Sequence, residues 1–133
     1  AAASGAAAGA PPADTLHAHL IAADALLAAG RQHEAGKRVV LVGGTLDART
    51  MPGAWGEFLR VRAEWHAQMS RPGDAYHDLA QSSSVFELLG HQYEAARTHL
   101  VLGRLAAHAG ARSLGKRYLD QAAATFAVTT PFR

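Results

Sequence analysis

The sequence predicts an all-α protein in which six helices pair into three antiparallel hairpins. Six stretches repeat apolar residues at steps of three and four, as amphipathic helices do, and none sustains the period of two that is typical of strands. Glycine or proline separates most of these stretches, which favours short turns. A repeat of about 40 residues relates the hairpins, so we expect them to stack on one another.

The six helices are expected in order along the sequence. The first shows the period clearly, with Leu16, Leu20, Ala23 and Leu27 on one face and Gly30 as its stop. The predicted helices cover about residues 14–29, 32–42, 55–69, 76–89, 93–107 and 114–126.

The first residues differ in composition from the rest. Residues 1–13 are rich in Ala, Gly and Pro and predict a flexible linker, so the folded domain is expected to span residues 14–133. Because the first residue is not methionine, we expect a piece of a longer protein. An alanine-rich composition suggests a bacterial genome of high GC content.

The segment "GKRVVLVGG" at residues 36–44 allows two interpretations. Its valines favour a strand, whereas the repeat favours a helix. The segment "GKRYLDQAAATF" at 115–126 aligns with "AYHDLAQSSSVF" at 75–86, one repeat length earlier. The first unit aligns with the second at an offset that is one residue shorter. In this alignment Val40 corresponds to Leu79 and Leu119, in the buried stripe of a helix. The repeat therefore predicts a helix at residues 39–42, against the local preference of the valines.

A phosphate-binding loop is the alternative that the glycines raise. The signature G-x-x-x-x-G-K-[ST] follows a strand, whereas "GARSLGKR" at 110–117 follows a helical pattern and ends in Arg117. We therefore interpret Gly30 and Gly110 as helix stops, and Gly36 and Gly115 as points of close helix packing.

The hairpins resemble the tetratricopeptide repeat. The third unit matches best, with Leu102-Gly103, Gly115 in place of an Ala, then Leu119 and Ala122. The second unit keeps Ala75 and Leu79, whereas Arg62-Ala63 and Ser82 depart from the pattern. Units of about 39 to 40 residues exceed the family period of about 34, as in lengthened repeats of bacterial signalling proteins and large ATPase-type transcription regulators. A HEAT-type repeat is the alternative at this length.

The resemblance implies a short solenoid whose first helices line a concave groove for a peptide or a partner helix. Carried over by position, and together with Glu57, it places in the groove Arg60, Glu64, Gln68, Arg97, Val101, Arg104 and His108. The three arginines would converge and bind carboxylates, so an acidic segment or the free carboxylate at the end of another polypeptide is the expected ligand. Alternatively, they are solvated or pair with Glu57 and Glu64.

Other functions find less support in the sequence. No catalytic motif, cofactor motif or cysteine occurs, and the eight histidines lack the spacing of a zinc site. The net charge of +2 without interleaved aromatics argues against nucleic acid, and no apolar run predicts a membrane helix. We expect a cytoplasmic, non-catalytic interaction or regulatory module of a larger bacterial signalling or transcription-regulating protein.

Two alternative functions stay open from the sequence. A helical bundle that binds a small molecule or metal, as a sensor or an enzyme, is the first, and a nucleic-acid-binding helical domain is the second. The apolar last helix, with Phe126, Val128 and Phe132, also predicts either a homodimer through that helix or a natural sequence that continues.

Overall fold

The computed structural model describes residues 13–129, and within them every regular element is a helix. The helices are α2 (Ala13–Ala28), α3 (Gln32–Thr45), α4 (Pro52–Gln68), α5 (Pro72–Leu88), α6 (Gln92–His108) and α7 (Arg112–Thr129). The all-α prediction is confirmed for these residues. The linker predicted at residues 1–13 lies outside them except for its last residue.

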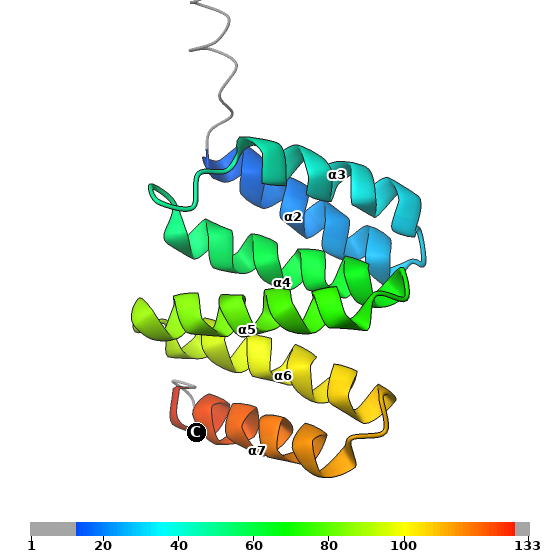
Figure 1. Ribbon diagram of the computed structural model, residues 1–133. Helices are drawn as coiled ribbons and strands as arrows, with labels where there is room; N and C mark the ends of the chain where they lie inside the picture. The colour runs from blue at the N-terminus through cyan, green and yellow to red at the C-terminus, as the bar shows by residue number, and fades with distance from the viewer. Residues whose placement is uncertain (1–12, 130–133) are drawn as a thin grey trace, which may run out of the picture.

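The helices pack as three hairpins, α2/α3, α4/α5 and α6/α7. Figure 1 shows them stacked in sequence order, from α2 and α3 at one end to α7 at the other. Helix α4 contacts both helices of the first hairpin, and α6 contacts both helices of the second. The first helices of the hairpins, α2, α4 and α6, therefore follow one another along one side of the stack.

The valine run at residues 39–42 is helical, as the repeat predicted, and lies inside α3. Val39 and Val42 are buried three residues apart, in one cluster with Leu16, Leu20 and Phe58. Burial of these side chains in a shared core outweighs the modest local preference of valine for strands. The segment therefore forms no phosphate loop.

The three units of the repeat are equally spaced along the sequence. The sequence alignment, which placed the first unit one residue closer to the second, is corrected by this spacing. Helices α3, α5 and α7 begin at residues 32, 72 and 112. Val39 is the buried counterpart of Leu79, whereas Val40 is 67% exposed. The expected place of Val40 in the core was wrong by one residue, because the Gly-Lys-Arg tripeptides of the first and third units do not occupy equivalent positions.

Four of the connections between helices use the same turn. Gly30, Gly90 and Gly110 have φ of 76°, 73° and 85°, and Ser70 occupies the equivalent place with φ of 60°. At each turn the next amide reaches back to the helix, as from Arg71 N–H to His66 O at 2.8 Å. This pairing is the Schellman motif, which satisfies the last carbonyl groups of a helix. The prediction that Gly30 and Gly110 end helices is confirmed.

Glycines bring neighbouring helices close together. A Cβ added at Gly36 would lie 2.9 Å from the Trp65 ring, and one at Gly115 would lie 2.9 Å from the carbonyl oxygen of Gly103. Both glycines were expected to allow close packing, and the structure confirms this. The tight contacts fix the spacing within the α6/α7 hairpin and between α3 and α4.

Candidate functional site

An open pocket of about 590 Å³ lies on the side formed by α2, α4 and α6. We call it the groove. Its floor is apolar, with the fully buried Ala63 and Leu79 between the helices. The residues that line it are Asp24, Ala25, Leu27, Ala28, Ala63, Glu64, Ala67, Gln68, Leu79, Val101, Arg104, Leu105 and His108.

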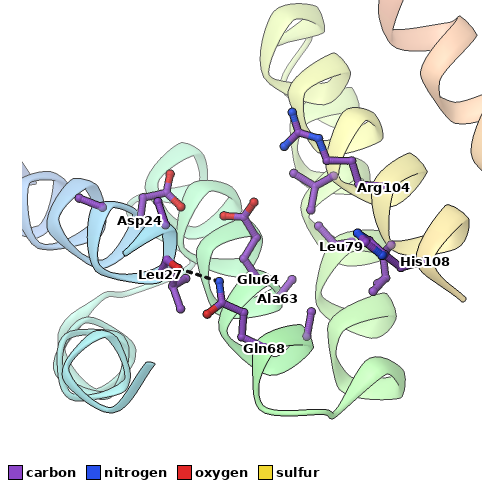
Figure 2. A pocket seen from close by; sticks show the side chains of 13 residues that line it. Asp24, Leu27, Ala63, Glu64, Gln68, Leu79, Arg104 and His108 are labelled. Carbon is purple, nitrogen blue, oxygen red and sulfur yellow. Dashed lines mark hydrogen bonds between the residues drawn. The ribbon is translucent and has the colours of Figure 1, made fainter. Parts of the chain in front are cut away.

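Side chains at equivalent repeat positions form rows across the groove. Asp24, Glu64 and Arg104 lie one repeat length apart in the sequence, and they come from α2, α4 and α6 in turn. Ala28, Gln68 and His108 form a second row in the same way, about one helical turn further along. The charge along the first row changes from acidic to basic, so the two ends of the groove differ in character (Figure 2).

Five of the residues predicted from the sequence line this groove. They come from α4 and α6, and they are Glu64, Gln68, Val101, Arg104 and His108. Gln68 is held by a hydrogen bond from its side-chain amide to the carbonyl oxygen of Leu27, at 3.0 Å, which ties α4 to α2 (Figure 2). The sequence thus predicted residues on two of the three helices that form the groove.

Arg60 and Arg97 lie outside the groove, so the expected convergence of three arginines was wrong. The Arg60 side chain is 7% exposed, and its Nη2 lies 2.8 Å from Glu94 Oε1, with the guanidinium 5.5 Å from the centre of the Phe86 ring. Arg97 lies 3.5 Å from the same carboxylate oxygen. One repeat length after Arg60 the sequence has Leu100, which does not line the groove, so Arg60 belongs to a row outside the groove.

The carboxyl groups of Asp24 and Glu64 project toward the same part of the groove (Figure 2). The pKa of Glu64 is raised to about 8, first by burial and then by the hydrogen bond and the negative charge of Asp24. Arg60 and Arg104 oppose this shift through their positive charges. Glu64 is therefore mostly protonated at neutral pH.

Arg104 and His108 form the opposite wall, on α6. Both side chains are exposed, and within residues 13–129 Arg104 has no carboxylate at ion-pair distance. A guanidinium that the protein itself does not pair can bind an external carboxylate or phosphate. Of the three predicted arginines, only this one lines the groove.

Histidines and acidic residues elsewhere make structural contacts. Asp78 is buried and accepts two hydrogen bonds from Arg62, at 2.7 and 2.8 Å, while His66 Nε2 lies 3.6 Å away. Burial lowers the pKa of His66. Across residues 13–129 no three His, Asp or Glu side chains gather as metal ligands. Nor does any helix there have the length and apolar character needed to cross a lipid bilayer.

The sequence interpretation missed the α2 wall, to which Asp24 and Ala28 belong. Both could have been found by carrying the positions of Glu64 and Gln68 back by one repeat length. The misplaced register of the first unit concealed that relation.

Comparison of the sequence with protein-family models, with curated proteins and with solved structures finds no match. The groove and its residues are therefore the basis for a functional assignment.

Proposed function

We propose that this protein is a non-catalytic interaction module of the tetratricopeptide-like type, which binds a peptide segment or a partner helix in the groove. The observation that carries the proposal is the groove itself, in which accessible apolar side chains such as Ala28, Val101 and Leu105 are flanked by charged ones. Apolar packing would supply affinity, and the charged walls would select the partner. A regulatory role in a larger bacterial signalling or transcription-regulating protein fits such a module.

Filling the groove tests this proposal. Peptides would first be selected from a random display library on the purified protein. Because Ala28 is exposed and lines the groove, Ala28→Trp should block it without disturbing the core. We expect selected peptides to lose at least about tenfold in affinity, which corresponds to about 1.4 kcal/mol, when measured by fluorescence polarisation.

The matched control is Ala123→Trp, at an exposed position on α7 away from the groove. It should leave peptide binding unchanged. Peptides that bind both variants equally well, or a library that yields no peptide sensitive to Ala28→Trp, would argue against groove binding.

A second candidate function is a small-molecule sensor, which the size of the pocket favours. A volume of about 590 Å³ falls within the range of roughly 300–1,000 Å³ that ligand sites occupy. Native mass spectrometry distinguishes the two, since a sensor should carry a small bound mass that Ala28→Trp removes.

The homodimer expected through α7 stays a prediction, with Val128 79% exposed on that helix.

A further inference from the structure

The charges of the groove are divided between its walls. Asp24 and Glu64 occupy the wall of α2 and α4, and Arg104 and His108 occupy the wall of α6 (Figure 2). A partner that brings positive charge to the first wall and negative charge to the second would complement this arrangement. The convergent arginines that would have favoured an acidic partner are absent from the groove, because Arg60 and Arg97 pair with Glu94.

The protein's own cations leave the acidic wall open to an external one. Arg60, one turn from Glu64 on α4, is buried against Glu94. The amide of Gln68 donates to the carbonyl oxygen of Leu27. Arg104, on α6, is near enough to influence Glu64 electrostatically, yet none of the ion pairs within residues 13–129 joins the two.

We propose that the groove recognises its partner through a basic side chain, whose ammonium or guanidinium group lies between the carboxyl groups of Asp24 and Glu64. This inference rests on the proposed function and names the chemistry of the partner. The aliphatic stem of a lysine or arginine would pack on the accessible apolar residues that line the groove, such as Ala28 and Ala67, as such stems do on protein surfaces. An acidic group of the same segment would meet Arg104 on the opposite wall.

Binding of the cation is coupled to loss of a proton. Below a pH of about 8 the carboxyl of Glu64 is protonated, so the incoming cation displaces that proton into solvent. The groups that face Glu64 are Asp24 from α2, Arg60 on its own helix, and Arg104 from α6. The affinity for a cation should therefore rise by up to about tenfold per pH unit between pH 6 and 8.

The test uses n-butylammonium as the head group of lysine, with sodium butyrate and n-butanol as matched probes. Carbon-13 NMR of the aspartate and glutamate carboxyl groups would follow titrations up to roughly 100 mM at constant ionic strength, because so small a probe binds weakly. We expect butylammonium to shift the signals of Asp24 and Glu64 and to lower the apparent pKa of Glu64. Butyrate and butanol should leave both signals in place.

Glu64→Gln keeps the shape of the side chain and removes its proton equilibrium. In this variant the affinity for butylammonium, followed at Asp24, should fall at pH 8 and no longer rise between pH 6 and 8. The control Glu87→Gln, at an exposed position on α5, should behave as the unchanged protein. The absence of shifts at Asp24 and Glu64, or equal shifts with butyrate, overturns the inference.

These outcomes are separate from those of the peptide selection. If selected peptides lose affinity in Ala28→Trp but carry no basic residue, groove binding stands and the cationic partner is wrong. If butylammonium binds at Asp24 and Glu64 while no peptide depends on Ala28, the cation site stands and the interaction module is wrong.

Discussion

At the scale of single residues, Glu94 shows how similar contacts differ in energy. Its carboxylate faces Arg60, whose side chain is 7% exposed, and Arg97, whose side chain is 46% exposed. A buried cation that loses its partner keeps the full cost of its desolvation, whereas an exposed one regains water. The buried arginine therefore makes Glu94 a structural residue between the second and third hairpins.

Glu94→Gln should lower the free energy of unfolding by about 3 kcal/mol, because it leaves the charge of Arg60 buried without its carboxylate partner. Arg97→Gln removes only the exposed pair and should cost less than about 1 kcal/mol. Urea unfolding of the two variants measures the difference. Similar small losses in both would show that solvent reaches Arg60 as well.

At the scale of the elements, one of the turns between helices contains a residue that does not suit its backbone conformation. Ser70 adopts the left-handed conformation that glycine occupies at the other three Schellman turns. A side chain in this region costs roughly 1–2 kcal/mol relative to the right-handed helix. No hydrogen bond of the Ser70 side chain to another residue within 13–129 offsets that cost.

Ser70→Gly should therefore stabilise the protein by about 1 kcal/mol and raise its melting temperature. The control is Ser84→Gly, at an exposed position inside α5, where glycine should destabilise by roughly 1 kcal/mol or less. Thermal denaturation followed by circular dichroism measures both. Changes of the same sign in the two variants would contradict the role of backbone conformation.

The helices could be predicted from the sequence because their signals are local and repeated. Apolar spacing and helix stops recur in each unit, and together they outweighed the valines of α3. The ion pair of Arg60 could not be predicted in this way, because its partner Glu94 lies in another hairpin, far along the sequence. Asp24 could not be predicted as part of the acidic wall, because its equivalence to Glu64 appears only when the first unit is aligned in phase with the other two.

At the scale of the whole molecule, the proton on Glu64 links stability to pH. Asp24 lies on α2 in the first hairpin and Glu64 on α4 in the second, and Asp24 helps to raise the pKa of Glu64. The pKa of Glu64 is raised from 4.5 to about 8 on folding. The folded protein therefore holds a proton that the unfolded protein has lost between these values, and stability must fall as pH rises through them.

We expect the free energy of unfolding to decrease by up to about 1.4 kcal/mol per pH unit between pH 5 and 8 through this group. Glu64→Gln should flatten that part of the profile and gain stability relative to the unchanged protein as pH rises. Urea unfolding from pH 5 to 9 provides the measurement, with Glu87→Gln as the control. Parallel profiles for all three proteins would contradict a raised pKa of Glu64.

The rows across the groove have a consequence for how such a protein can change. Because Asp24, Glu64 and Arg104 occupy one register in three units, each charge can be exchanged without touching the turns or the core. Duplication of a unit would lengthen each row by one side chain while leaving its pitch unchanged. The preference for a partner could then change by single substitutions in these rows, while the helices and turns that position the side chains stay the same.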